Sequence, residues 1–394
     1  MDIVYYTRPS FLDPAFSKIE ALSQILNVHL FIELSPESWQ SAIFDISNQE
    51  LTSGVHDGVS FLERVFPSSL HKYWKRCASV SLVVHTCSKS IHPKTWRVSY
   101  QAMKYIKKLN PDVFHLDDIS LRLAPLLFTL KGVPFVLNIH DAKAHSGEHN
   151  WRTEIARWLT IRKVDHFILH SNFSCKQFLK HYDVAESRVT MIPLGIYDIY
   201  REWLTSEIPE EPNTVLFFGR ISPYKGVEVF VKAAELVSTS IPNVRFIIAG
   251  KAIQGYSLPN LPQLKNGSVF EIYPEYLSNT QVATLISRSS LVVCPYLDAS
   301  QSGVILTAYA FNKPVIATDV GGLPEYVWEG KTGRIIQPND PTALADAIVN
   351  MLSKKTAENS SPAVYDMLRK NELSWDNSAE ETRRIYEKVI QSHN

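Results

Sequence analysis

FFGRISPYKG, residues 217–226, joins the end of an apolar run to two cations and a closing glycine. The run TVLFFG at 214–219 predicts a buried strand, and the residues after Gly226 have the spacing of a helix. In an open α/β sheet, ligands bind beyond the carboxyl ends of the strands, next to the helices that follow. Arg220 and Lys225 therefore predict a diphosphate site at a helix N-terminus, against the simpler alternative of two exposed loop cations.

Around this segment, the second half of the chain alternates short apolar runs with longer stretches of helical spacing. The expected strands are 214–219, 244–250, 269–273, 291–296, 314–318 and 333–338. The expected helices are 226–240, 279–289, 303–311, 322–329 and 341–353. Continuous apolar strands separated by helices are typical of a parallel sheet that is covered on both faces.

The first half of the chain has the same rhythm. Its expected strands are 2–6, 29–34, 80–86, 113–116, 135–141, 166–171 and 188–193, and its expected helices are 15–27, 94–109, 120–131, 150–163 and 172–182. Two serial runs of this kind predict two doubly wound, Rossmann-like α/β domains with parallel sheets. Between them, IYDIYREWLTSEIPEEPN at 196–213 loses the apolar periodicity and has the composition of a linker. We therefore expect domains at 1–200 and 210–370.

The composition excludes several classes of protein. The 394 residues carry 40 Lys and Arg against 40 Asp and Glu, which argues against a protein that mainly grips nucleic acid. Four scattered cysteines give neither a disulfide scaffold nor a zinc motif. The N-terminal residues do not have the pattern of a secretory leader, and no apolar run approaches the ~18 residues of a membrane span. We expect a soluble protein of the cytoplasm.

One stretch departs from this even charge. Residues 64–111 contain two tryptophans, Trp74 and Trp96, and no acidic residue. The cations of the stretch are Arg64, Lys72, Lys75, Arg76, Lys89, Lys94, Arg97, Lys104, Lys107 and Lys108. A solvated basic face is one interpretation. The other is a surface that meets an anionic membrane or acceptor, where each basic residue near the bilayer contributes roughly 1 kcal/mol.

A second motif, DASQSGVILTAYAFNKPVIATDVGGLPEYV at 298–327, directly follows an expected strand. Ser302 and Gly303 lie where a strand-to-helix turn directs backbone N–H groups toward an anion, and glycine allows that anion a close approach. Asp298 at the start of the loop has a carboxylate that can accept hydrogen bonds from sugar hydroxyls, or it is an ordinary turn or N-cap residue.

Together, these motifs and EGKTGRIIQPNDPTALADAI at 329–348 resemble the retaining glycosyltransferases of the GT-B fold, family 4 (glycosyltransferase group 1). The likeness covers nearly the whole second half, and a looser one runs through four segments of the first half, 112–118, 133–141, 164–178 and 189–196. The resemblance implies two Rossmann-like domains with a deep cleft between them. The family's final helix returns to the N-terminal domain, which here implies that 373–394 joins that domain.

The resemblance also implies roles for single residues. It gives Arg220 and Lys225, with Ser302 and Gly303, to the donor diphosphate. The catalytic residues that it implies are His140, at the end of the strand with the family's "HD" ending, together with Asp141 and Asp298. The nucleoside side is implied to consist of Gly219, Tyr276, Leu277 and Thr307. His115 takes the place of the family's earlier histidine on the acceptor side of the cleft.

The sequence departs from the family pattern in two places. Members commonly carry two glutamates spaced E-x7-E, the first on sugar hydroxyls and the second on the ribose. Here Asp298 stands in for the first, and Thr307, which offers only a hydroxyl, occupies the place of the second. The glycine-rich loop after the first strand is also missing, because YYTRPSFLDP at 5–14 contains no glycine.

The resemblance thus implies a retaining hexosyltransferase that takes a sugar from a nucleotide diphosphate donor, with UDP-glucose as the first choice. Its acceptor would be a lipid-linked or polysaccharide intermediate, and the enzyme would work at the inner face of the cell membrane. Arg, Lys and helix N-termini meet the phosphate charge in this fold, so we expect no metal and no cofactor, despite the adjacent Asp117 and Asp118. The alternatives are a sugar-nucleotide epimerase, a phosphorylase-like relative, and a catalytically silent nucleotide-sugar-binding partner of a glycosyltransferase complex.

Overall fold

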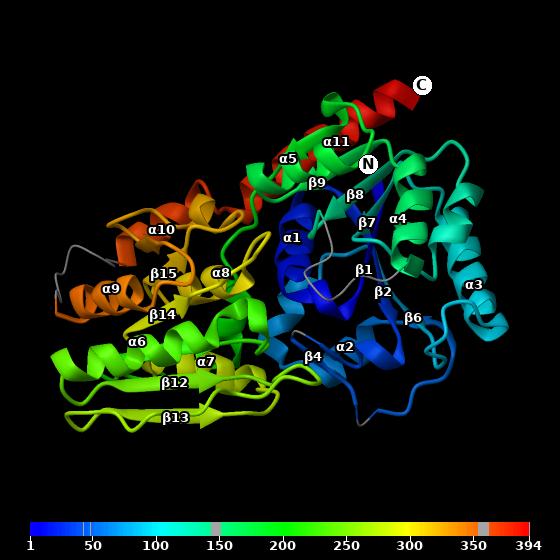
Figure 1. The fold of residues 1–394 in the computed structure, drawn as a ribbon. Coiled ribbons are helices and arrows are strands. Elements are labelled where there is room, and N and C mark those ends of the chain that lie inside the picture. Colours follow the sequence, from blue (N-terminus) through cyan, green and yellow to red (C-terminus); the bar gives the residue numbers. More distant parts are fainter. Residues whose placement is uncertain (42, 48, 143–150, 354–361, 394) are drawn as a thin grey trace. The chain divides into compact units, whose positions relative to one another are not determined.

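The computed structural model describes residues 1–41, 43–47, 49–142, 151–353 and 362–393, and it divides into two compact units (Figure 1). Unit 1 comprises Met1–His170, Cys175–Gly195 and Glu372–Asn394. Unit 2 comprises Ser171–Ser174 and Ile196–Asn371. The chain passes between the units after Gly195 and after Asn371, and both units are α/β.

The sheet of unit 1 has the strand order β10-β9-β8-β7-β1-β2-β6-β5. Its strands are β1 (Asp2–Thr7), β2 (Asn27–Leu34), β5 (Gly54–Asp57), β6 (Ser79–Val84), β7 (Val113–Asp117), β8 (Phe135–Ile139), β9 (His166–Leu169) and β10 (Val189–Met191). All pairs are parallel except that of β5 with β6. β1, β7 and β8 are almost entirely buried, as their unbroken apolar runs predict.

Helices cover this sheet. They are α1 (Leu12–Ile25), α2 (Val59–Val65), α3 (Pro93–Leu109), α4 (Trp151–Lys163), α5 (Asn172–His181) and α11 (Trp375–His393), with the 3-10 helices η1 (Pro9–Phe11), η2 (Pro36–Ser38), η3 (Ser68–Tyr73), η4 (Ala124–Thr129) and η5 (Glu186–Arg188). The inner residues of α3, η4 and α4 share one apolar cluster with β7 and β8. The helix expected over 120–131 is this shorter 3-10 helix, which has a proline in its first turn.

The sheet of unit 2 is wholly parallel, with the strand order β13-β12-β11-β14-β15-β16. Its strands are β11 (Thr214–Phe218), β12 (Arg245–Ala249), β13 (Val269–Tyr273), β14 (Leu291–Cys294), β15 (Val315–Thr318) and β16 (Gly333–Ile336). Its helices are α6 (Val227–Ser240), α7 (Asn279–Arg288), α8 (Gly303–Ala310), α9 (Pro341–Ser353) and α10 (Pro362–Lys370), with the 3-10 helices η6 (Asp198–Trp203), η7 (Pro223–Lys225) and η8 (Leu323–Tyr326). Two doubly wound parallel sheets confirm the predicted fold class.

Three features differ from the sequence-based expectation. The segment 196–213, expected to be a linker, belongs to unit 2, because η6 packs against α7 and α8 and Asp198 pairs with Arg369 at 3.0 Å. β5 and the small hairpin of β3 (Gln40–Ser41) and β4 (Phe44–Asp45) were not expected, nor was α10. None of the helices in the described part of the chain is long and apolar enough to cross a bilayer.

Candidate functional site

The strand order of unit 2 reverses at β11 and β14. The chain runs outward from β11 through β12 to β13, then returns to place β14 on the other side of β11. The crevice beyond the carboxyl ends of two such strands is the usual ligand site of an open α/β sheet. Arg220 and Lys225 follow β11, and Ser302 and Gly303 follow β14, so the four residues predicted to bind the diphosphate all lie at this switch point.

Gly226, at the end of the cationic loop, has a conformation and a position that require glycine. Its φ is +70°, and a Cβ there would lie 2.0 Å from the carbonyl oxygen of Pro295. The amide of Leu297 also donates to the carbonyl of Tyr224 at 2.7 Å. The loop after β11 is thus held directly against the segment that follows β14.

Two tyrosines hold the two cations of the loop. The Lys225 Nζ atom lies 3.7 Å from the ring centroid of Tyr296, a cation–π contact with a buried ring. Arg220 is exposed, and its Nη2 atom donates to the hydroxyl of Tyr224 at 3.4 Å. The structure therefore keeps both cations at the carboxyl edge of the sheet and leaves Arg220 open to solvent.

Helix α8 presents its N-terminus at the same edge. Ser302 is its N-cap residue, but the Ser302 hydroxyl donates to the hydroxyl of Tyr296 at 3.3 Å, and no side-chain cap closes this helix in the described structure. Uncapped N–H groups in the first turn and the positive end of the helix dipole favour an anion. Two cations and a helix N-terminus at one switch point can neutralise a diphosphate.

The other residues predicted for the donor differ in their accessibility. Asp298 is exposed on the loop between β14 and α8. Thr307 is buried in α8, and its hydroxyl donates to the carbonyl of Gly303 at 2.8 Å, so only its oxygen lone pairs remain for a ligand. Tyr276 and Leu277 lie between β13 and α7, as expected, with Leu277 almost fully buried. Gly219 has a φ of +115° and faces Val304 of α8.

In unit 1, the strand order reverses at β1 and β7, and a second polar group lies at the carboxyl ends of these strands and β8. His140 directly follows β8, and its Nε2 atom lies 2.9 Å from Oδ1 of Asp117, the final residue of β7. The ring of Phe11 stacks on the imidazole at 4.1 Å, with 11° between the planes. Asn138 and Thr7 donate to the same carboxylate, at 2.8 Å and 3.0 Å.

The charges of this pair are coupled. Burial disfavours the imidazolium, but the charge and hydrogen bond of Asp117, with Asp118 and Asp141 nearby, raise the pKa of His140 above its ordinary value. Burial alone would likewise raise the pKa of Asp117, but His140 and Asn138 hold it well below the usual range. The two residues thus form a buried ion pair. Asp141 lies beside it, and its carbonyl accepts from Arg157 at 2.9 Å.

His115, predicted for the acceptor side, is a core residue of unit 1 in this structure. It is fully buried in β7, where its Nδ1 atom bonds to the hydroxyl of Tyr386 on α11 and its ring packs against Tyr5. Burial, with the nearby charge of Lys18, lowers the pKa of His115 to about 3, so the ring is neutral. With no exposed surface, His115 connects the sheet to α11 through Tyr386.

Two partners of these residues were missed by sequence reasoning. Asp117 was considered only as half of a metal-like pair. The usable signal was that Asp117 ends one buried strand and His140 directly follows the next, so both lie at the same edge of a parallel sheet. Lys18 of α1 is buried near Asp117 and Glu381, and burial lowers its pKa to about 8. A lysine within a helical apolar pattern gives no comparable signal. Among the described residues, no group of three or more His, Cys, Asp and Glu is arranged to hold a metal ion.

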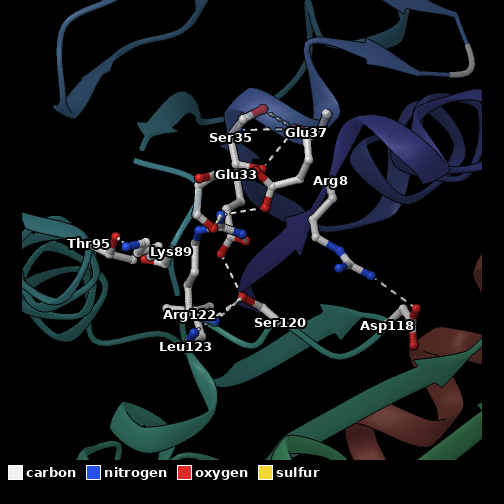
Figure 2. A network of polar contacts seen from close by, with 12 residues as sticks. Arg8, Glu33, Ser35, Glu37, Lys89, Thr95, Asp118, Ser120, Arg122 and Leu123 are labelled. Atoms are coloured by element: carbon white, nitrogen blue, oxygen red, sulfur yellow. Dashed lines mark hydrogen bonds and ion pairs between the residues drawn. The ribbon is translucent and has the colours of Figure 1, made fainter. Parts of the chain in front are cut away.

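Near the buried pair of His140 and Asp117, here called the dyad, a network of polar contacts lies at the carboxyl edge of β1, β2 and β7 (Figure 2). Glu33 is buried and accepts from the hydroxyls of Ser120 and Tyr6, at 2.7 Å and 2.8 Å. Arg122 bonds to Glu37 at 2.5 Å, and Arg8 pairs with Asp118 at 3.0 Å. Arg8 thus lies at the switch point of unit 1, in the turn where the family's glycine-rich loop is missing.

The chain is similar to known glycosyltransferases over most of its length. Residues 63–198 match the family model of Glycosyltransferase Family 4, and residues 212–354 match that of Glycosyl transferases group 1. The chain is 27% identical over 295 residues to D-inositol 3-phosphate glycosyltransferase of Nocardioides sp., and 25% identical over 281 residues to the protein of that name from Mycolicibacterium paratuberculosis. These matches cover 66% and 68% of this chain but only 63% of the length of each relative.

Solved structures have the same fold along the whole chain. Sucrose-phosphate synthase from Thermosynechococcus elongatus aligns with a TM-score of 0.67 at 16% identity, over 100% of both chains. HepE of Anabaena, solved in complex with UDP-glucose, aligns with a TM-score of 0.62 at 18% identity, over 98% of this chain and 99% of that one. The fold is GT-B. With a family 4 domain in its first half and a group 1 domain in its second, this chain belongs to the family 4 (group 1) glycosyltransferases.

Proposed function

We propose that this protein is a retaining, metal-independent hexosyltransferase, which transfers a sugar from a nucleotide diphosphate to an acceptor glycan. The observation that carries the proposal is the switch point of unit 2, where Arg220, Lys225 and the N-terminus of α8 converge. Preorganised cations and N–H groups stabilise the charge that develops on a departing diphosphate, so the carbon–oxygen bond of the donor breaks more easily. In this proposal, His140 acts beside the reacting carbon, and Asp117 orients and charges its ring.

For the donor we propose UDP-glucose. This choice rests on family membership and on HepE of Anabaena, a protein of the same fold that was solved with this nucleotide sugar. For the acceptor we propose a lipid-linked or growing polysaccharide intermediate of glycoconjugate biosynthesis. The curated relatives are named for a small acceptor, D-inositol 3-phosphate, and that compound is therefore the comparison acceptor in any assay.

Incubation with a panel of nucleotide sugars is expected to release nucleotide diphosphate fastest from UDP-glucose, and faster still with acceptor present. Activity is expected to survive exhaustive chelation with EDTA, because Arg, Lys and a helix N-terminus can supply the positive charge. The anomeric configuration of the product, read by NMR, is expected to match that of the donor. Magnesium-restorable loss of activity would overturn metal independence, and an inverted product would overturn retention.

The same panel separates the alternatives. The Thr307 hydroxyl, which donates within α8, is the observation that favours a catalytically silent nucleotide-sugar-binding partner, since no carboxylate stands there to bind the ribose. Such a partner binds UDP by calorimetry but releases none from any donor. An epimerase instead changes the donor sugar without needing an acceptor. Acceptor-dependent release of UDP is expected only from the glycosyltransferase.

We further propose that unit 1 meets an anionic membrane through one face, here called the aromatic face. The face consists of five exposed large side chains, Trp96 and Tyr100 of α3, Phe128 of η4, and Ile155 and Trp158 of α4. Both α3 and α4 pack against η4, so the helices that carry these side chains form one layer (Figure 1). Trp and Tyr favour the headgroup region of a bilayer, where one end of the ring is apolar and the other is wet.

Cations surround this face. On α3 the exposed basic residues are Lys94, Arg97, Lys104, Lys107 and Lys108. On α4 the guanidinium of Arg162 lies 3.5 Å from the ring centroid of Trp158. The other expected tryptophan does not contribute, because Trp74 is buried against Phe16 and Phe66. Within the basic stretch 64–111, exposed aromatic rings therefore lie near the cations of α3 and not near those around Trp74.

Co-sedimentation with vesicles tests this face. The protein is expected to bind vesicles that contain anionic lipid and not to bind neutral vesicles. It is expected to dissociate from the anionic vesicles at high ionic strength. The triple variant Arg97→Glu, Lys104→Glu, Lys107→Glu is expected to lose this binding, while the release of UDP from UDP-glucose in water is unchanged. The matched control is Lys72→Glu, Lys75→Glu, Arg76→Glu, which reverses three exposed cations on and beside η3, a helix that packs on α1. If the Arg97, Lys104, Lys107 variant bound anionic vesicles as strongly as the wild type and the control variant do, residues 64–111 would be a solvated basic surface only.

A further inference from the structure

Tyr296 is the buried centre of the cationic site. It follows β14, is 1% exposed, and is among the largest fully buried side chains of the chain. Its ring faces Lys225 at 3.7 Å, its hydroxyl accepts from Ser302 at 3.3 Å, and its carbonyl accepts from the Thr318 hydroxyl at 2.6 Å. One residue therefore contacts a cation of the loop after β11, the N-cap of α8 and the end of β15.

The position of the tyrosine is fixed by backbone contacts on both sides. Pro295 lies so close to Gly226 that no Cβ fits between them, and the amide of Leu297 donates to the carbonyl of Tyr224. The cationic loop and the segment around Tyr296 are thus in direct backbone contact. The long flexible stem of Lys225, which could otherwise sample many rotamers, ends on a rigid aromatic face.

We infer that Tyr296 is a positioning residue, which holds the Lys225 ammonium at the diphosphate site before the donor arrives. The inference rests on the proposed function, since it assumes that Lys225 meets a diphosphate. A cation over the face of an aromatic ring is stabilised electrostatically, most strongly where water is excluded, as beside this buried ring. Holding the charge in place beforehand removes an ordering cost that the donor would otherwise bear on binding.

The hydroxyl of Tyr296 has a separate, smaller task. It accepts from Ser302 and so draws that side chain away from the first amides of α8, which stay open to an anion. The aromatic face serves Lys225 and the hydroxyl serves Ser302, so substitutions can separate the two. Tyr296→Phe keeps the face and removes the hydroxyl, whereas Tyr296→Leu removes both.

Calorimetric titration with UDP and with uridine, which lacks the diphosphate, tests the inference. Tyr296→Leu is expected to weaken UDP binding by about ten-fold and to leave uridine binding unchanged. Tyr296→Phe is expected to stay within about three-fold of the wild type for UDP, because the ring remains. The control for general destabilisation is Tyr309→Leu, which removes another fully buried tyrosine of unit 2, bonded to Tyr326 and Thr332.

The double variant Lys225→Ala, Tyr296→Leu is expected to bind UDP no more weakly than Lys225→Ala alone, since the ring acts through the lysine. Equal weakening of UDP and uridine in Tyr296→Leu, as a general structural defect would give in Tyr309→Leu, would overturn the inference. So would unchanged UDP binding by a folded Tyr296→Leu protein. If Lys225→Ala itself binds UDP normally, the diphosphate site is wrong; if Lys225→Ala weakens binding and Tyr296→Leu does not, only the role of Tyr296 is wrong.

Discussion

Lys225→Ala is expected to weaken UDP binding by between ten- and a hundred-fold. A charge-assisted hydrogen bond to a diphosphate contributes about 1.5–3 kcal/mol, and about 1.4 kcal/mol corresponds to a factor of ten. The effect should fall on the phosphate part of the ligand, so uridine binding is expected to stay unchanged. Arg220→Ala is expected to behave alike but less strongly, because the guanidinium of Arg220 is exposed to water and salt. Isothermal titration calorimetry at low and moderate salt measures both.

The matched control for Lys225→Ala is Lys232→Ala, which removes an exposed lysine from α6, the helix that begins just after the cationic loop. This variant is expected to bind UDP as the wild type does. Wild-type UDP affinity in both Lys225→Ala and Arg220→Ala would show that the switch point of unit 2 does not bind the diphosphate. Comparable losses in all three variants would mean that net charge alone, without a particular contact, governs binding.

His140→Ala is expected to lower kcat by about a hundred-fold or more and to leave UDP affinity nearly unchanged. In the proposed function the imidazole acts on the reacting sugar, so the transition state loses a contact that the nucleotide does not make. The variant also leaves the Asp117 carboxylate buried without its cationic partner, and an uncompensated buried charge costs about 3–5 kcal/mol of stability. Steady-state kinetics and thermal unfolding of the same samples separate the two effects.

His166→Ala is the control for His140→Ala. His166 is also a buried histidine, but it begins β9, at the opposite end of the strand from the dyad's edge, and bonds to Thr190 at 2.8 Å. It is expected to lower stability with little change in kcat. If His140→Ala reduced UDP affinity and kcat equally, or if both histidine variants lost kcat alike, His140 would have no special part in the reaction.

The dyad also predicts a pH dependence. The pKa of His140 is raised above 6.5, so the stabilisation by its ion pair is complete below pH 6.5 and is lost as the pH rises through the raised value. The pKa of Asp117 is lowered below 3.8, so the pair persists well into acid. The difference in unfolding free energy between the wild type and His140→Ala, measured by denaturant titration, should therefore shrink as the pH rises through the raised pKa of His140.

The sequence predicts most of the regular elements because both sheets are parallel and buried. Runs such as 214–219 and 291–296 are apolar on both faces, a pattern that a strand covered on both sides requires. β5 was not predicted, because its four residues, Gly54–Asp57, include His and Asp and pair antiparallel at the edge of the sheet. The helices expected near 120–131 and 322–329 shorten to 3-10 helices, each with a proline in its first turn.

In the site, too, residues that are neighbours in the chain could be predicted, and residues brought together only by the fold could not. Arg220 and Lys225 are predictable, because a strand, a glycine and a helix lie next to them in the chain. Their tyrosine partner Tyr296 is not, because it becomes a neighbour only when β14 takes its place beside β11. The burial of His115 is also hard to foresee from the sequence. His115 sits in the middle of a strand, and α11, which follows unit 2 in the chain, covers it.

That return of the chain has a consequence for how the protein is made. The ribosome produces the β-strands of unit 1 first, yet α11, whose Tyr386 lies against His115, emerges only after the whole of unit 2. Domains usually fold in the order of their synthesis, N-terminal first. Here unit 2, which is almost continuous in the chain, is fully synthesised before α11, the helix that packs against α1 of unit 1. We therefore expect the nascent chain to pass through a stage in which unit 2 is folded while unit 1 still exposes the part of its core that α11 covers.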